Sequence, residues 1–148
     1  AAPMHDIGKI GIPDRILLKP DPLTAEEFTR IQEHTNIGYN ILKHSGRDIM
    51  QSAAIIALQH HEKWDGSGYP QHLSGSQIHL FARITAISDV LDALLHPRPY
   101  KHAWSQEEVR TYLEEQSGVQ FDPGLVDLLL AHFDEFLAII ASHPSPEC

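Results

Sequence analysis

A histidine and an aspartate stand side by side near the start of the sequence, with a lysine close behind them. Lys9 follows Asp6 by three residues and His5 by four. At helical spacing the lysine shares their face one turn further on. A carboxylate can bridge two metal ions, and an ammonium beside it can hold a phosphate oxygen. The group suggests metal-assisted phosphate chemistry, whereas a solvated polar patch is the alternative for a His-Asp pair taken alone.

Three further segments carry side chains that bind metals. His60 and His61 are adjacent and could serve two different ions, with an exposed pair as the alternative. His34 lies inside a predicted helix. Asp89 falls in an otherwise apolar helical stretch, where a carboxylate needs a cation or an ion pair, and Asp92 follows on the same face. Mixed imidazole and carboxylate ligands favour iron, manganese or zinc over calcium or magnesium. Together these segments predict a two-metal site that activates water for phosphoryl chemistry.

A glycine-rich segment follows the histidine pair. Residues 64–76 contain Gly66, Gly68 and Pro70 among polar side chains, which predicts a loop. The glycines permit a positive φ and a close approach of the backbone to a ligand or partner, and the proline stiffens the exit. A plain surface turn is the alternative.

The elements that must position these groups are helical. No segment shows sustained alternation of apolar and polar residues. Capping boxes begin at Thr24 and Ser105, and Asp122-Pro123 marks another helix start. We predict an all-α helical bundle in a single domain. The predicted helices span residues 24–44, 47–61, 78–95, 105–116 and 122–141; residues 8–22 form a loop, residues 142–148 a tail, and the first residues the end of an upstream helix. The predicted inward positions are Phe28, Ile31, Thr35, Gly38, Ile41, Leu42, Ile49, Ala53, Ile56, Ala57, Leu80, Ile84, Ile87, Leu91 and Leu94.

Composition excludes several classes of protein. The 148 residues are 42% hydrophobic, which is enough for a folded core. A formal charge of −9 argues against binding DNA through its phosphate backbone. Cys148 is the single cysteine, so no intrachain disulfide forms and a reducing, cytoplasmic location is expected. No apolar run reaches 18 residues, so no membrane contact is expected. The 11 histidines equal lysine plus arginine in number, which favours a metal site.

Three strings resemble a known family. Residues 5–14, HDIGKIGIPD, resemble the HD motif of the HD-GYP family. Residues 60–70, HHEKWDGSGYP, resemble its second signature, and residues 83–101, RITAISDVLDALLHPRPYK, also match. The three strings occur in the family's order, and the similarity extends to about residue 127. The family is a branch of the HD-domain metal-dependent phosphohydrolases.

The resemblance implies an HD-domain helical fold and hydrolysis of cyclic di-GMP, a bacterial second messenger, to linear pGpG or to GMP. It implies divalent metal ions, expected as two of iron or manganese, with zinc, nickel or magnesium as alternatives. Activated water would then attack phosphorus in line. The implied metal ligands are His5, Asp6, His34, His60, His61 and Asp89, with Asp6 as the bridge; the implied catalytic residues are Asp6 and Lys9; the implied substrate contacts are Lys9, Gly68, Tyr69, Asp92, Arg98 and Lys101.

The resemblance also has implications for neighbouring parts and partners. Family members normally carry two more helices upstream of the HD motif, so residues 1–148 are expected to be an N-terminally truncated HD-GYP domain. An upstream sensory or receiver domain is expected, as are contacts between the Gly68-Tyr69-Pro70 loop and diguanylate cyclase (GGDEF) domains. Two alternatives stay open: a non-catalytic module that binds nucleotide or a cyclase partner, and an HD phosphohydrolase for another nucleotide.

Overall fold

The computed structural model describes residues 1–96 and 102–142, and its regular structure is helical. Extended residues pair within these ranges only at an isolated bridge between Ser117 and Phe121. The all-α prediction is therefore confirmed. The 3-10 helices are η1 (Ala2–Met4), η2 (Ile7–Gly11) and η3 (Gly75–Gln77); the α-helices are α1 (Asp14–Leu17), α2 (Ala25–Gln32), α3 (His34–Leu42), α4 (Asp48–Gln59), α5 (Leu80–Leu95), α6 (Gln106–Gln116), α7 (Pro123–Ala131) and α8 (Phe133–Ser142).

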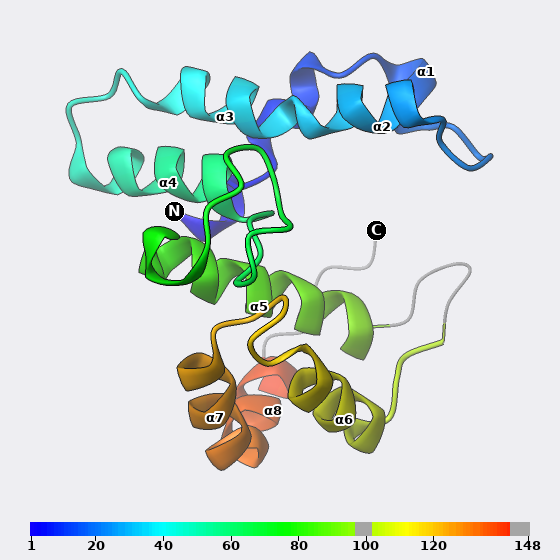
Figure 1. Cartoon of the computed structure of the whole chain (residues 1–148), viewed down its shortest axis with the longest axis vertical. Helices are drawn as coiled ribbons and strands as arrows, with labels where there is room; N and C mark the ends of the chain where they lie inside the picture. The colour runs from blue at the N-terminus through cyan, green and yellow to red at the C-terminus, as the bar shows by residue number, and fades with distance from the viewer. Residues whose placement is uncertain (97–101, 143–148) are drawn as a thin grey trace.

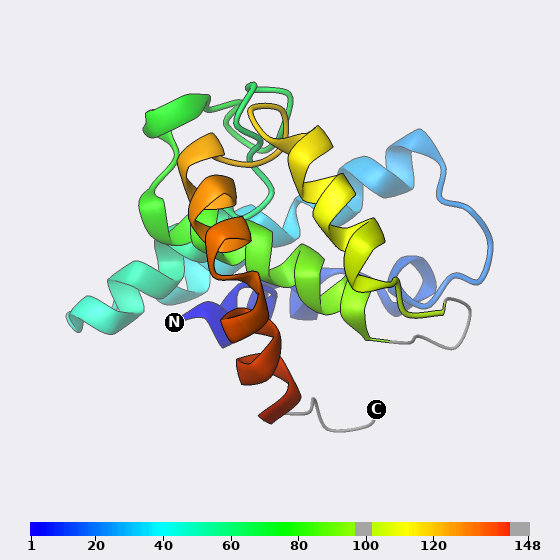
Figure 2. The same cartoon turned by 90° about the horizontal axis from the view of Figure 1, so that it is seen from below.

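The helices stack in layers around α5 (Figure 1). Helices α2 and α3 run end to end, α4 packs against α3, and α5 separates α4 from α6, α7 and α8. Seen from below, α6, α7 and α8 cover one side of α5 (Figure 2). The larger core cluster joins these last four helices through fully buried side chains that include Leu91, Leu113, Phe121 and Phe133.

A smaller core between α3 and α4 positions the histidines. It contains Leu42 and the small buried residues Ala53, Ala54 and Ala57. An added Cβ on Gly38 would lie 3.1 Å from the Cβ of Ala57, so the two helices approach closely because both positions are small. This close packing brings the start of α3 next to the end of α4.

The predicted helix starts are confirmed by hydrogen bonds. The Thr24 hydroxyl accepts from the Glu27 amide at 3.2 Å, and the Glu27 carboxylate accepts from the Thr24 amide at 2.8 Å. Ser105 forms the same reciprocal pair with Glu108. The Asp122 carboxylate accepts from the Gly124 amide at 2.9 Å. Local side-chain chemistry thus determines where these helices begin.

The single helix predicted over residues 24–44 is wrong, because the structure breaks it at Glu33 between α2 and α3. The Glu33 amide donates to the carbonyl of Arg30, three residues back. Beside this turn, His34 Nδ1 lies 2.6 Å from the carbonyl of Ile31 and the Thr35 hydroxyl donates to the carbonyl of Gln32 at 2.9 Å. Side chains that bind nearby carbonyls compete with the helical ladder and loosen it at this point.

The ends of the described chain also differ from the predictions. Residues 2–4 form a 3-10 turn rather than the end of an α-helix, and the predicted loop at 8–22 contains η2 and α1. The predicted last helix is divided at His132, whose φ of −118° and ψ of 26° leave the helical region. The turn at residues 2–4, η2 and the break at His132 have hydrogen bonds between residues three apart, whereas α1 also has bonds between residues four apart.

Several predicted inward positions are exposed. Phe28, Ile41, Ile49, Leu80 and Ile84 retain 44–62% of their accessible surface. Ile84 borders a cavity of about 450 Å³ between α5, α7 and α8. Helical periodicity predicts an apolar face but not which part of that face another helix covers. Within the described ranges, no helix is long and apolar enough to span a bilayer.

Candidate metal centre

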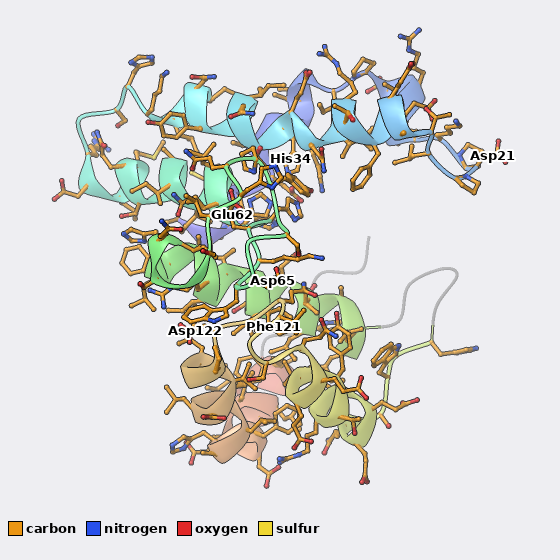
Figure 3. All side chains as sticks on the ribbon, in the orientation of Figure 1. Asp21, His34, Glu62, Asp65, Phe121 and Asp122 are labelled. Carbon is orange, nitrogen blue, oxygen red and sulfur yellow. The ribbon has the colours of Figure 1, made fainter. Side chains whose placement is uncertain are left out.

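Four ligand side chains from three separate segments meet at one point. Asp6, His34, His60 and His61 each offer a ligand atom, and these atoms lie within 4.8 Å of one another. Asp6 stands just before η2, His34 begins α3, and the two other histidines follow the last residue of α4. Figure 3 labels His34 at the junction of α2 and α3, near the end of α4. The structure therefore brings together four of the six predicted ligands.

The two oxygens of the Asp6 carboxylate face different partners. Oδ1 lies 3.5 Å from His34 Nε2 and 3.8 Å from His60 Nε2. Oδ2 lies 3.4 Å from His5 Nε2 and 2.5 Å from Lys9 Nζ. A carboxylate with ligand atoms on both sides has the arrangement that a bridging ligand requires.

His5, the fifth predicted ligand, contacts Asp6 directly, and Asp89, the sixth, meets this group through His5. Its carboxylate lies 3.6 Å from His5 Nε2 and is 45% exposed. Other predicted site residues lie further along the same chain segment. The Asp92 carboxylate pairs with His96 Nδ1 at 3.1 Å one turn later. Arg98 and Lys101 fall outside the described residues.

Backbone carbonyls fix the orientation of the imidazoles. Nδ1 of His34 lies 2.6 Å from the Ile31 carbonyl, and Nδ1 of His60 lies 3.1 Å from two carbonyls of α4. A carbonyl only accepts hydrogen bonds, so each Nδ1 carries the proton and each Nε2 presents a lone pair. The two Nε2 atoms are 3.4 Å apart. Two lone pairs at this distance repel unless a cation lies between them, so the residues fit a metal ion.

The spacing of the donors also fits a metal. A ligand-to-metal distance of about 2.1 Å places neighbouring ligands roughly 3.0–3.4 Å apart around one ion. The distances of 3.4–3.8 Å among His34, His60 and Asp6 lie close to this range. A shift of a few tenths of an ångström would complete the shell.

Burial keeps three of the imidazoles neutral. Removal from water lowers the pKa of His60 to about 4, and the neighbouring His5 and His34 add to the shift. Burial likewise lowers the pKa of His61 to about 3, with His60 contributing. Burial is also the main cause of the lowered pKa of His34. Neutral imidazole is the form that binds a metal, so these side chains are ready as ligands at pH 7.

The carboxylate at the centre keeps its charge. Burial alone would raise the pKa of Asp6, but hydrogen bonds from His5 and Lys9 outweigh burial and hold the pKa well below its usual range. The hydrogen bond to Asp6 is the main cause of the raised pKa of His5. The centre therefore stabilises positive charge next to Asp6, as a cation site must.

The glycine-rich loop packs tightly on the end of α4. The Tyr69 amide donates to the His61 carbonyl at 3.2 Å, and the Tyr69 ring stacks on the His61 ring with centroids 4.8 Å apart. A Cβ on Gly68 would lie 2.3 Å from the Lys63 amide nitrogen, so only glycine fits there. Burial, followed by the charge of Asp6, raises the pKa of Tyr69 to about 12. The tyrosine therefore keeps its phenolic proton and is a neutral ring beside the ligands.

Glu62 holds the other side of this loop, a role that sequence reasoning missed. Its residue surface is 3% exposed, and its two carboxylate oxygens accept from the Gln71 amide at 2.6 Å and the Leu73 amide at 3.0 Å. Figure 3 labels Glu62 beside the end of α4. The available signal was an acidic residue placed directly between two ligand candidates and a glycine-rich loop.

Replacing Glu62 by alanine is expected to lower the free energy of unfolding by about 1–3 kcal/mol, because two amides lose their acceptor. Glu62→Gln should lower the free energy of unfolding by a smaller amount, since one oxygen is replaced by an NH₂ donor that faces an N–H. Chemical denaturation measures both. Glu114→Ala, on the exposed face of α6, is the matched control and should stay within about 0.5 kcal/mol. Equal stability of Glu62→Ala and the control would contradict the anchoring role.

The sequence profile described as "HD domain" matches residues 1–125. This span contains all six predicted ligands and most of the chain. The chain belongs to the HD-domain family, which confirms the prediction made from its three motifs.

Particular relatives match over most of the chain. The chain is 54% identical over 144 residues to the 3'3'-cGAMP-specific phosphodiesterase 2 of Vibrio cholerae serotype O1, covering 97% of this chain and 28% of that protein. It is 53% identical over 130 residues to the cyclic di-GMP phosphodiesterase response regulator RpfG of Xanthomonas campestris pv. campestris, covering 88% and 34%. It is 51% identical over 130 residues to a cyclic di-GMP phosphodiesterase of Thermotoga maritima, covering 88% and 35%. The chain thus spans about a third of the length of these relatives.

Proposed function

We propose that the chain is a metal-dependent phosphodiesterase domain that hydrolyses cyclic di-GMP to pGpG, GMP or both, in bacterial signalling in the cytoplasm. The observation that carries this proposal is the convergence of one carboxylate and three neutral imidazoles within 4.8 Å. The naming of several relatives as cyclic di-GMP phosphodiesterases supports the choice of substrate.

We further propose that two ions share Asp6. His34, His60 and His61 would hold one ion, because they gather with Asp6, and His34 and His60 lie on the side of its Oδ1. His5 and Asp89 would hold the other, because Oδ2 lies next to His5 and His5 contacts Asp89. Iron or manganese suits this mixture of ligands best. Bound ions would supply Lewis-acid stabilisation of the phosphoryl transition state and lower the pKa of the attacking water.

The chain's own cations and loop would position the substrate. Lys9 is 42% exposed beside Asp6, so its ammonium can exchange that partner for a phosphate oxygen. Gly68 and Tyr69 would line the same side as His61, which the Tyr69 ring contacts. The further substrate contacts that we propose are Asp92, Arg98 and Lys101.

Reconstitution tests the activity directly. Chelated protein should lack hydrolysis of cyclic di-GMP and regain it with iron or manganese, at about two ions per chain by metal analysis. A folded protein that takes up no metal would contradict the centre. Binding of cyclic di-GMP with a full metal complement and no turnover would instead support a non-catalytic module.

A second candidate substrate is 3'3'-cyclic GMP-AMP, because a relative named for that substrate is 54% identical to this chain. This nucleotide has the same kind of phosphodiester ring as cyclic di-GMP, with adenine in place of one guanine. Parallel assays with both cyclic dinucleotides decide between them through the ratio of their kcat/KM values.

Lys9→Ala is expected to raise KM for the cyclic dinucleotide about tenfold while leaving the metal content unchanged, because a charged contact to phosphate contributes about 1.5–3 kcal/mol. Steady-state kinetics and metal analysis of the same preparation measure the two quantities. If the variant also lost metal, Lys9 would act by holding Asp6 in place rather than by contacting the substrate.

We also propose partners for the parent protein. The exposed residues around Gly68-Tyr69-Pro70 would contact a diguanylate cyclase (GGDEF) domain, and an upstream sensory or receiver domain would control the activity. Pull-down of a purified cyclase domain, with Ser67→Arg as the interface variant, tests the first contact, since Ser67 is exposed in this loop.

A further inference from the structure

A row of aromatic rings leads away from the metal-ligand group. The ring of Tyr69 stacks on His61 with an interplanar angle of 27°, and it also meets the ring of Phe28 edge to face, with centroids 6.4 Å apart. Phe28 lies on α2 and is 48% exposed. We propose that Phe28, backed by Tyr69, is a stacking platform for one nucleobase of the substrate. This inference rests on the proposed phosphodiesterase function and names how its substrate is held.

Phe28 does not serve the core. Helix α2 contains no buried residue, and the phenylalanine keeps half of its surface in water although burial of a phenyl ring is favourable by about 1.5–3 kcal/mol. Its ring contact is with Tyr69, a residue that itself contacts a candidate ligand. An exposed aromatic ring in this position is better explained by a ligand than by folding.

The chemistry of a cyclic dinucleotide fits this position. Its phosphates would lie at the metal centre and contact Lys9. Each base is joined to a phosphate through one ribose. A base therefore projects from the phosphate toward the rim of the site, where Phe28 lies two ring contacts from the ligand His61. Stacking on an aromatic ring tolerates either purine, so the platform serves both candidate substrates.

Steady-state kinetics provide the first test. Phe28→Ala should raise KM for the cyclic dinucleotide about tenfold or more, with kcat within about threefold and the metal content unchanged, because base stacking contributes about 1–3 kcal/mol. Phe28→Trp should restore the affinity. Phe81→Ala is the matched control: Phe81 is 46% exposed and also meets another ring edge to face, that of His79, but it borders a different cavity, between α4, α5 and η1.

Three kinetic outcomes overturn the platform. An unchanged KM in Phe28→Ala would show that no base stacks there. A fall in kcat alone would show that Phe28 acts by holding Tyr69 against His61. An equal rise in KM in Phe81→Ala would assign the effect to stability rather than to stacking.

A binding measurement separates this inference from the proposed activity. The probe is 2-aminopurine riboside 5'-monophosphate, whose fluorescence is quenched when its base stacks. Wild-type protein and Phe81→Ala should quench it, and Phe28→Ala should not. Quenching that depends on Phe28 in a protein that hydrolyses no cyclic dinucleotide would retain the platform and reject the phosphodiesterase proposal. Hydrolysis of the cyclic dinucleotide with equal quenching in all three proteins would retain the phosphodiesterase proposal and reject the platform.

Discussion

Asp6→Ala should abolish metal retention and reduce hydrolysis of the cyclic dinucleotide by at least about a thousandfold. The carboxylate lies within 3.8 Å of the Nε2 atoms of His5, His34 and His60, and it is the one residue that joins the two proposed ligand sets. Its removal leaves buried neutral imidazoles with no central negative charge. Loss of one electrostatic contact at a reaction centre already costs a factor of about 100–1,000, and loss of the bridge affects two ions together.

Metal analysis and hydrolysis should be measured on the same preparation of this variant. Asp6→Asn keeps the size of the side chain and removes its charge, so it should also lose metal while remaining folded by circular dichroism. Asp127→Ala, an exposed change on α7, should retain both properties. Normal turnover with two ions in Asp6→Ala would show that another group bridges the centre.

Gly8→Ala is expected to lower the free energy of unfolding by about 3 kcal/mol or more. A Cβ at this position would lie 1.9 Å from the carbonyl oxygen of His34 and 2.5 Å from the amide nitrogen of Gly38. Both neighbours are backbone atoms of α3, so neither can rotate away, and η2 must move off the helix. Because η2 follows Asp6 directly, the displacement should also weaken metal binding.

Chemical denaturation of the metal-free protein isolates the effect on folding. Gly46→Ala is the matched control, since a Cβ there would meet no atom within 4 Å, and it should change stability by less than about 0.5 kcal/mol. If Gly8→Ala does not fold, Gly11→Ala offers a milder case: its Cβ would meet side-chain atoms of Ile37 at 2.9 Å, which can give way. Equal stability of Gly8→Ala and Gly46→Ala would contradict this close contact between η2 and α3.

Local patterns predicted much of this structure. The capping boxes at Thr24 and Ser105 depend on residues three apart, and both form. The long apolar helix predicted over 78–95 corresponds closely to α5. The ligand residues followed from family motifs, which encode spatial proximity that spacing alone cannot reveal: His34 and His60 are 26 residues apart in sequence.

The features that sequence reasoning missed depend on contacts between distant segments. The break at Glu33 arises from competition for carbonyls, and no residue there is a helix breaker. Phe28 follows the helical period of the inward face, yet no helix covers it within the described chain. In the sequence Glu62 is an ordinary charged residue. In the structure it is buried, and its partners are backbone amides nine and eleven residues away.

The carbonyls of Ile31, Ile56 and Ala57 that orient His34 and His60 have a consequence for metal choice. Backbone atoms, rather than the ion, aim these two lone pairs, so the donor set is organised before any ion arrives. The affinity of nitrogen and oxygen donors for divalent ions generally rises from manganese through iron to copper, so the availability of each ion also decides which one occupies the site. The ion recovered from purified protein will therefore report the supply in the growth medium as much as the preference of the protein.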